Sequence, residues 1–511
     1  METFDSYVLF ALIVLPLAGA ALLLAIPGRR ATLIRWTATL FAFAALVLSS
    51  YTFLFYYLNH RDQGGMQFIR TWEWLELPGA GPLGGQGISL ALGVDGIAAP
   101  MLLLTGIVMF TGVLTSWTIR DRSKDFFILY FLLLSGVFGV FASLDMFFFF
   151  FFYELAVLPM YLLIGIWGSS STFSTFVRTK EYSAMKLMLY LVAGSVLVWI
   201  AILAIFVEGG LGTFNILELE KVTLSENFQR VFFPFLMIGF GVLAGLWPFH
   251  TWSPDGHVAA PTAVSMVHAG VLMKLGAFGI LRIGITLLPQ GAEDWMPVLI
   301  GLGTVNVLYG AVSAMGQRDL KYVIGYSSVS HMGFVLMGIA TLNSLGVTGA
   351  VLQMFAHGVM TALFFAAVGI IYDRTHTRDI TVLSGLAKRM PVAASVFTVA
   401  GLASLGLPGM SGFVAELLVF LGLFQTYPVL GVLGIIGAAV TAVYILRLLS
   451  RVFFGPMDER WEDQTDASPR EGFTTLILVG FIFLVGLFPF PFIRVIDSGV
   501  EQLLARFPGA G

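Results

Sequence analysis

Residues 147–166 read FFFFFFYELAVLPMYLLIGI, and the side chain of Glu154 carries the only charge in this stretch. A helix that crosses the hydrocarbon core of a bilayer needs about 20 largely apolar residues. A carboxylate in the middle of such a helix is costly to hold in lipid, and its default interpretation is functional. The stretch therefore predicts a membrane-spanning helix with a functional acid near the middle of the membrane.

The composition of the whole chain points the same way. Of its 511 residues, 58% are hydrophobic and 11% are charged, whereas soluble domains carry about 25% charged residues. We therefore predict a single polytopic membrane domain over residues 1–511. The absence of cysteine excludes disulfides, thiolate zinc sites and iron–sulfur clusters in this chain, and a net charge of -3 gives no signature of nucleic-acid binding.

Apolar runs of spanning length recur along the chain and predict an all-α integral membrane protein with about 14 transmembrane helices. The runs lie near residues 8–26, 32–57, 97–117, 126–143, 146–167, 184–207, 232–249, 261–288, 296–315, 322–341, 345–372, 391–425, 428–453 and 473–490. The segment between the second and third runs, residues 58–95, is patterned like short strands around a glycine-rich turn.

The basic residues orient these helices. Most of the 27 lysines and arginines fall in loops that follow odd-numbered helices, such as those around Arg120, Arg318 and Arg374. Cytoplasmic loops of membrane proteins carry the excess of lysine and arginine. We therefore expect both termini on the non-cytoplasmic side of a bacterial plasma membrane.

Two of the predicted crossings contain helix breakers. The run 391–425 would extend roughly 50 Å as a straight helix, against a hydrocarbon core of about 30 Å. Its Pro408 and Gly409 predict a break at 407–412 within one crossing. A similar break is predicted at 241–249, around Gly245 and Pro248. Unwound backbone at membrane depth is tolerated where it lines a cavity or is buried in protein, so these breaks indicate a permeation path.

The two breaks lie five helices apart. Because five is an odd number, two copies of a five-helix unit would have opposite topology, as in transporters built from inverted repeats. We therefore predict one repeat at about 126–288 and a second at about 296–453. The flanking helices would cover residues 8–117 and 473–490.

Five ionisable residues stand out inside the predicted helices: Glu154, Lys274, Glu416, His331 and His357. Counted from the start of each helix, all but Glu416 fall within about 5 Å of the membrane midplane; Glu416 directly follows the predicted break. Intramembrane charges at a common depth favour a proton path, and a buried lysine amine can load and release a proton. His268 is a weaker candidate, because it lies about 120° around the helix from Lys274.

Structural alternatives exist for several of these residues. Glu416 could cap the half-helix that follows the break, and His331 and His357 could be core histidines that bridge helices. Snorkelling explains Lys186 at the cytoplasmic edge at least as well as transport does. His250, Asp255 and His257 are residue types that can bind a metal ion. Their position in a loop disfavours such a site, so we predict no metal site.

Four segments resemble the proton-conducting membrane subunits that respiratory complex I shares with multisubunit cation/proton antiporters. They read FYEL (152–155), PFHTWSPDGH (248–257), APT (260–262) and YSSVSHMG (326–333). The resemblance runs over nearly the whole chain, and the length near 500 residues with an acid at Glu416 is similar to the subunit M, or chain 4, type. It implies a proton-translocating subunit of NADH:quinone oxidoreductase, without redox chemistry of its own.

The resemblance also implies roles and partners. Glu154, Lys274 and Glu416 match the family's fifth-helix glutamate, central lysine and terminal glutamate, and His331 and His357 match histidines of its central axis. Cofactors are not expected in this chain; NAD(H), FMN, iron–sulfur clusters and quinone would lie on partner subunits, with L-like and N-like subunits as membrane neighbours. A cation/proton antiporter subunit and a non-pumping structural member of such a complex remain open alternatives.

One position departs from the family pattern. The family normally has lysine in the broken seventh helix, where this chain has Leu243. That lysine is the usual ion-pair partner of the fifth-helix glutamate, so its loss removes the charge that keeps such an acid ionised. We therefore expect Glu154 to have weaker control over proton loading than its family counterparts.

Overall fold

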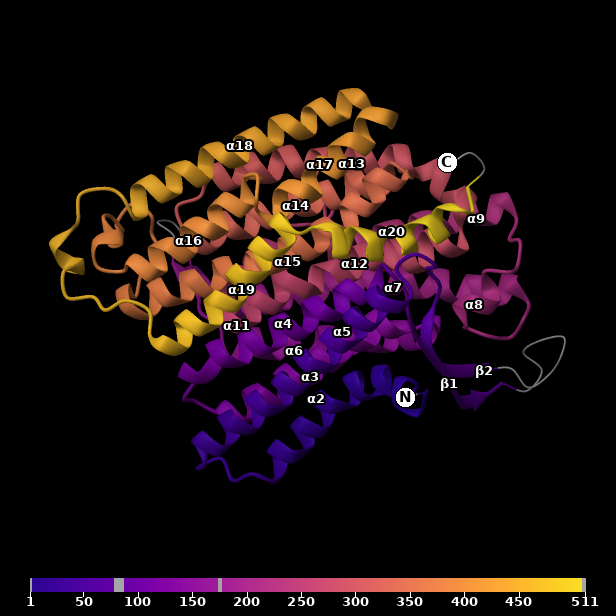
Figure 1. Ribbon diagram of the computed structural model, residues 1–511, viewed down its shortest axis with the longest axis horizontal. Helices are drawn as coiled ribbons and strands as arrows, with labels where there is room; N and C mark the ends of the chain where they lie inside the picture. The colour runs from indigo at the N-terminus through magenta and orange to yellow at the C-terminus, as the bar shows by residue number, and fades with distance from the viewer. Residues whose placement is uncertain (1, 78–86, 173–176, 508–511) are drawn as a thin grey trace.

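The computed structural model describes residues 2–77, 87–172 and 177–507. Long helices run side by side along one common direction (Figure 1). Thirteen crossings of the described chain are long and apolar enough to span a bilayer. Twelve of them are α2 (Val8–Ala25), α3 (Ala31–Asn59), α4 (Ala98–Thr115), α5 (Ser123–Ala142), α6 (Met146–Trp167), α7 (Lys180–Gly209), α9 (Glu226–Ala244), α13 (Pro289–Gly316), α14 (Leu320–Ala340), α15 (Ser344–Thr375), α18 (Pro428–Val452) and α19 (Pro469–Leu487).

The remaining crossing is a composite that contains Lys274. It begins with α11 (Thr262–Val267), passes through a π-helical turn at His268–Leu272 into α12 (Met273–Gly279), and ends in a second π-helical segment, Ile280–Ile285. The apolar core of this crossing and that of α15 consist entirely of buried residues, whereas only about a third of the corresponding residues are buried in α18 and α19. π-Helical turns occur frequently at functional sites. The enclosed helices therefore form the centre around which a site can be built.

The predicted break in the run 391–425 is confirmed. Two short helices, α16 (Pro391–Ser404) and α17 (Ser411–Thr426), replace one long one, and together they supply the fourteenth crossing. The break begins slightly earlier than predicted, because Gly406 already has a φ of +71° and Gly409 one of +92°. Both angles lie in the left-handed region that glycine adopts without steric cost.

The predicted break near 241–249 is also confirmed. Helix α9 ends at Ala244, Gly245 has a φ of +79°, and the chain resumes as α10 (Trp252–Ala259) before α11. Asn306 on α13 compensates for the lost helical hydrogen bonds: its Oδ1 accepts from the Trp247 amide at 2.6 Å, and its Nδ2 donates to the Gly245 carbonyl at 2.8 Å. The unwound backbone is thus held by a buried side chain, as backbone at membrane depth requires.

Outside the crossings, the predicted strands are present as β1 (Gln67–Glu76) and β2 (Gly87–Val94), which pair antiparallel. A minor pair, β3 (Ser171–Thr172) and β4 (Val177–Arg178), was not predicted. Three short helices, α1 (Glu2–Asp5), α8 (Ile216–Leu219) and α20 (Phe490–Leu504), complete the secondary structure together with 3-10 turns.

Helix α20 was missed by the sequence analysis. Its charged residues Arg494, Asp497 and Glu501 keep it below the hydropathy of a span, yet its other face buries Val495, Ile496 and Val500. It packs against α15, α3 and α4. It is therefore an amphipathic helix that covers the bundle rather than a further crossing.

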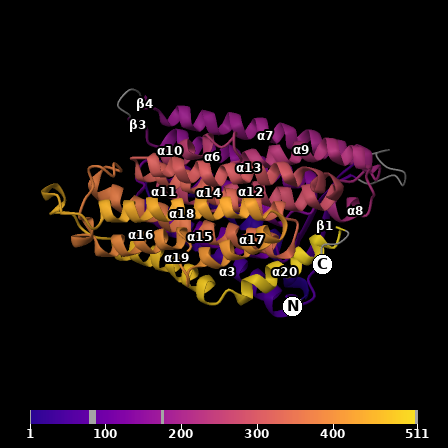
Figure 2. The same ribbon diagram turned by 90° about the horizontal axis from the view of Figure 1, so that it is seen from above.

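Both termini lie at the end of the bundle that also carries β1 and β2, in both views (Figures 1 and 2). An even number of crossings requires this arrangement, so it agrees with fourteen. The architecture is that of a multi-pass, all-α membrane protein. The division into two inverted repeats, 126–288 and 296–453, stays a prediction.

Candidate functional site: a buried line of ionisable side chains

The site is centred on Lys274, whose side chain is completely buried at the start of α12. Its Nζ lies 2.7 Å from Nδ1 of His357 on α15 and donates to the carbonyl of Ala269 in the preceding π-helical turn. No carboxylate forms an ion pair with Lys274 in the described part of the chain. An amine that is held by neutral partners can give up its proton more easily than one held by an acid.

From His357 the line continues to the broken crossing. The imidazole rings of His357 and His331 have centroids 5.3 Å apart, and Nδ1 of His331 lies 3.4 Å from Oε1 of Glu416. Lys274, His357, His331 and Glu416 come from α12, α15, α14 and α17, and each is at most 5% exposed. Four of the five predicted residues therefore follow one another across the centre of the bundle, with the two imidazole rings in contact rather than hydrogen-bonded.

Neutral polar side chains hold this line in place. Nε2 of His331 lies 3.0 Å from the Ser404 hydroxyl at the end of α16, and Nδ1 lies 3.3 Å from Nε2 of Gln353. On the far side of the same region, the Tyr444 hydroxyl donates to Ser327 at 2.7 Å. His331 is therefore fixed between Glu416 and His357 by partners that do not carry a net charge.

The break itself brings Glu416 into the line. A Cβ added to Gly406 would lie 2.8 Å from Oε2 of Glu416, so the carboxylate packs against the backbone of the break. Glu416 lies beyond the first turn of α17, which contains no acidic residue. The contact with His331, and not helix capping, accounts for its position.

Glu154 lies apart from the other four. It sits on α6, is half-buried, and faces the Ser195 hydroxyl of α7. Its Oε1 has no hydrogen-bond partner among the described residues, and no ion pair of the described chain includes this acid. Leu243 is completely buried near the end of α9. The structure contains no substitute cation at Glu154 within the described residues.

Sequence reasoning missed an ion-pair cluster around Asp255 on α10. Asp255 is 3% exposed and accepts from Lys186 at 2.9 Å, from the Tyr322 hydroxyl at 3.0 Å and from Arg178. Snorkelling is therefore the wrong interpretation of Lys186, because its amine pairs with a buried carboxylate. The span-end position of Asp255 was visible in the sequence, but its partners come from β4, α7 and α14.

A second missed group lies at the opposite end, where the termini lie. Arg282 pairs with Asp95 at 2.6 Å, and both side chains are 6% exposed. They line a cavity of about 170 Å³ together with Glu220 and Arg506, and these two residues form their own ion pair at 2.6 Å. The predicted run 261–288 contains Arg282, but only the fold shows that its side chain pairs with Asp95.

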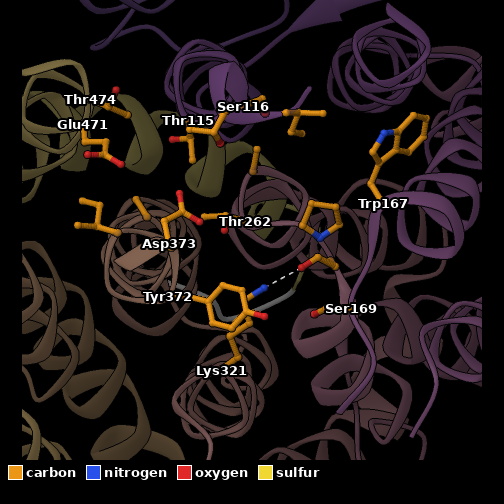
Figure 3. Close-up of a pocket in the computed structure, with 18 of the residues that line it drawn as sticks. Thr115, Ser116, Trp167, Ser169, Thr262, Lys321, Tyr372, Asp373, Glu471 and Thr474 are labelled. Atoms are coloured by element: carbon orange, nitrogen blue, oxygen red, sulfur yellow. Dashed lines mark hydrogen bonds between the residues drawn. The ribbon is translucent and has the colours of Figure 1, made fainter. Parts of the chain in front are cut away.

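Lys321 is the third missed residue. It begins α14 at the basic end of the bundle, is 5% exposed, and donates to the Ala260 carbonyl at 2.7 Å. It lines a cavity of about 210 Å³, whose wall also contains Thr262, Asp373 and Glu471 (Figure 3). The sequence pattern places Lys321 in a basic loop, and its neighbours in the sequence do not distinguish it from exposed lysines.

The histidines near α10 do not form a metal site. His250 packs edge-on against Tyr309, with ring centroids 4.9 Å apart, whereas His257 lies beside His268 with centroids 4.0 Å apart. Among the residues that the structure describes, no group of three or more histidine, aspartate or glutamate side chains is arranged to hold a metal ion.

The amino-acid sequence is similar to those of known membrane proteins. Residues 143–442 match a family described as NADH:quinone oxidoreductase/Mrp antiporter, transmembrane. NAD(P)H-quinone oxidoreductase chain 4 2 of Thermosynechococcus vestitus is 39% identical, and the match covers 98% of this chain and 92% of that protein. NAD(P)H-quinone oxidoreductase chain 4 of Gloeobacter violaceus is 37% identical over 94% of this chain and 89% of that protein.

Solved structures show the same fold. A chain of respiratory complex I from Thermus thermophilus superposes with a TM-score of 0.87 at 28% identity, over 98% of this chain and 100% of that one. A chain of the Mrp complex from Dietzia superposes with a TM-score of 0.83 at 20% identity, over 99% of this chain and 98% of that one. The second likeness is one of fold alone.

Proposed function

We propose that this chain is a proton-translocating membrane subunit of a quinone oxidoreductase complex. The chain belongs to the NADH:quinone oxidoreductase/Mrp antiporter membrane family. Its relatives at 35–39% identity are chain 4 of NAD(P)H-quinone oxidoreductases, matched over most of their length. The complex would couple quinone reduction to proton transport, and this chain would supply part of the path.

The observation that carries the proposal is the buried line from Lys274 to Glu416. A proton on the Lys274 amine can pass to Nδ1 of His357 across 2.7 Å. His331 then connects His357 with Glu416, which lies 3.4 Å from its Nδ1. Each of these groups binds and releases a proton without moving far, as a proton relay requires. Glu416 beside the helix break would release the proton toward the other side.

Glu154 would act as a proton-carrying acid on the first half of the path, as its family counterpart does. Its half-buried position and unpartnered Oε1 leave it able to bind a proton. Because position 243 carries a leucine, Glu154 has no neighbouring lysine with which it could form or break an ion pair as the charge of Lys274 changes. We therefore assign the main relay to Lys274, His357, His331 and Glu416, with Glu154 as a secondary member.

The rest of the complex would supply the redox chemistry. NAD(H), FMN, iron–sulfur clusters and quinone would be bound by other subunits, and L-like and N-like membrane subunits would lie beside this chain. The excess of lysine and arginine at the end of the bundle away from the termini supports a bacterial plasma membrane topology with both termini on the non-cytoplasmic side.

The fold alone does not separate this function from that of a cation/proton antiporter subunit, since a chain of an Mrp complex has the same architecture. The identity to chain 4 proteins over nearly the full length favours the oxidoreductase. Purification of the chain with its partners distinguishes the two, because only the oxidoreductase brings NADH- and quinone-binding subunits with it.

The test is proton translocation by the intact complex in sealed inside-out vesicles, measured per electron delivered to quinone. Lys274→Ala and Glu416→Gln should each lower this ratio while the complex remains assembled. An unchanged ratio in both variants would show that the line does not conduct, and would leave this chain as a structural member of the complex.

A further inference from the structure

The cavity at the basic end of the bundle leads to a buried amine. It is lined by Lys321, Asp373 and Glu471 together with Thr262, Thr474 and other polar side chains. Figure 3 shows these residues grouped around the space, and its dashed line marks the hydrogen bond from the Lys321 amine to the Ala260 carbonyl. Asp373 is exposed at its edge and forms no ion pair in the described part of the chain, whereas Glu471 pairs with Arg374 at 2.6 Å. The cavity therefore offers an acid to solvent and a buried base behind it.

Lys321 is placed where a permanent positive charge is unfavourable. It lies in the first turn of α14, where the helix dipole presents its positive end. Asp319, Asp373 and Arg378 are the charged groups close enough to influence its amine, and the Asp319 carboxylate is already paired with Arg378 at 3.1 Å. A lysine with no dedicated acidic partner can exchange its proton.

Ser265 connects Lys321 to the interior. The Lys321 amine lies 3.3 Å from the Ser265 hydroxyl, and that hydroxyl donates to the carbonyl of His257 at 2.8 Å. His257 is completely buried and lies within electrostatic range of both Lys321 and Lys274. His257 is thus an ionisable side chain that both lysines influence electrostatically.

Three of the four imidazole nitrogens of His257 and His268 lack a hydrogen-bond partner among the described residues, while Nε2 of His257 lies 3.1 Å from the Ser253 hydroxyl. The three are Nδ1 of His257 and both ring nitrogens of His268, and both rings are completely buried. Buried polar atoms without a protein partner are ordinarily satisfied by ordered water. The two adjacent rings, with centroids 4.0 Å apart, thus present three such nitrogens within electrostatic range of Lys274.

We propose that Lys321 is the proton-transfer residue that loads Lys274 from the cavity at the basic end, through His257 and His268. The Lys321 ammonium gives a proton to water at the neutral imidazole of His257, and Lys274 takes it up from there. Lys321 then regains a proton from the cavity, so no charge is left behind. This inference rests on the proposed function. Lys321 would deliver protons to Lys274 by a route that does not depend on Glu154, which has no lysine at position 243.

The test compares four single variants of the intact complex in the vesicle assay: Lys321→Met, Lys321→Arg, His257→Gln and Lys274→Ala. Because a guanidinium keeps its charge at all working pH values, Lys321→Arg preserves a structural or electrostatic role and removes proton transfer. Lys388→Met is the matched control, since Lys388 is exposed at the same end and does not line this cavity.

We expect Lys321→Met and Lys321→Arg to lower proton translocation per electron as far as Lys274→Ala does, within about twofold, and Lys388→Met to leave it unchanged. Should Lys321→Met fail to assemble, Lys321→Arg and His257→Gln carry the test. Normal translocation in Lys321→Arg overturns the proposal, because the residue then acts only through its charge. Loss in Lys274→Ala with normal translocation in both Lys321 variants overturns it too, while leaving the proposed function intact. Normal translocation in Lys274→Ala overturns the proposed function itself.

Discussion

Nδ1 of His331 lies 3.4 Å from Oε1 of Glu416, and this contact exists because the crossing that carries Glu416 is broken. Helix α16 ends at Ser404, whose hydroxyl lies 3.0 Å from Nε2 of the same histidine. The last residue of α16 and a residue in the second turn of α17 therefore both contact one imidazole. In an unbroken helix, Ser404 and Glu416 would lie roughly 18 Å apart along the axis, too far for both to contact His331. The break therefore positions the end of the relay.

Gly406→Ala tests this link. The substitution strains a backbone with a φ of +71° and places a methyl group 2.8 Å from Oε2 of Glu416, so we expect a loss of about 1 kcal/mol or more in stability. Proton translocation should fall as Glu416 is displaced. Thermal unfolding of the purified complex and the vesicle assay measure the two effects.

The matched control is Gly301→Ala. A Cβ added at Gly301, within α13, would meet no atom within 4 Å, and alanine is favoured in helices by about 0.5–1 kcal/mol over glycine. Equal effects of the two substitutions would contradict a special role for Gly406.

Leu243→Lys should restore the ion pair that this chain lacks. The new amine would be buried at the position of a completely buried leucine and would favour the ionised form of Glu154. We expect a carboxylate band of Glu154 to appear in infrared difference spectra and to vanish in the Leu243→Lys, Glu154→Gln double variant. Proton translocation should change at the same time.

Leu243→Met serves as the control, because it keeps an apolar side chain of similar volume. If the lysine variant changes neither the spectrum nor the proton ratio, Glu154 is not governed by the residue at position 243.

Asp255→Asn should destabilise the protein strongly. Asp255 is 3% exposed and neutralises Lys186 and Arg178, and removing one partner of a buried ion pair costs about 3–5 kcal/mol. We expect a lower yield of assembled complex and a lower thermal transition. Glu218→Gln breaks the exposed pair with Lys221 and should cost less than about 1 kcal/mol. Similar losses in both variants would argue against the Asp255 cluster as a structural anchor.

Asn306→Ala should loosen the first helix break. Its amide satisfies the Trp247 amide and the Gly245 carbonyl, and each buried group left without a partner costs about 1–3 kcal/mol. Hydrogen exchange should therefore accelerate at the amides of residues 245–247. In Asn59→Ala, which removes only an exposed bond within α3, exchange at these residues should stay as in the unaltered protein.

Much of the architecture followed from the sequence. The length of the apolar runs, the run of 391–425 that exceeds one bilayer thickness, and the proline and glycine residues within it are local properties, and they predict fourteen crossings with two breaks. Helix α20 was not predicted, because its charged residues lower its hydropathy. Its buried face depends on contacts with α15 and α3, which the sequence does not reveal.

The common depth of Lys274, His331 and His357 was also visible in the sequence, because depth follows from position along a helix. Which side chains meet was not. The contact of Lys274 with His357, the pairing of Arg282 with Asp95 and the cavity beside Lys321 each join helices that are distant in the chain. Sequence patterns set how far each residue lies across the membrane, whereas only the packing of the helices decides which residues at that depth face one another.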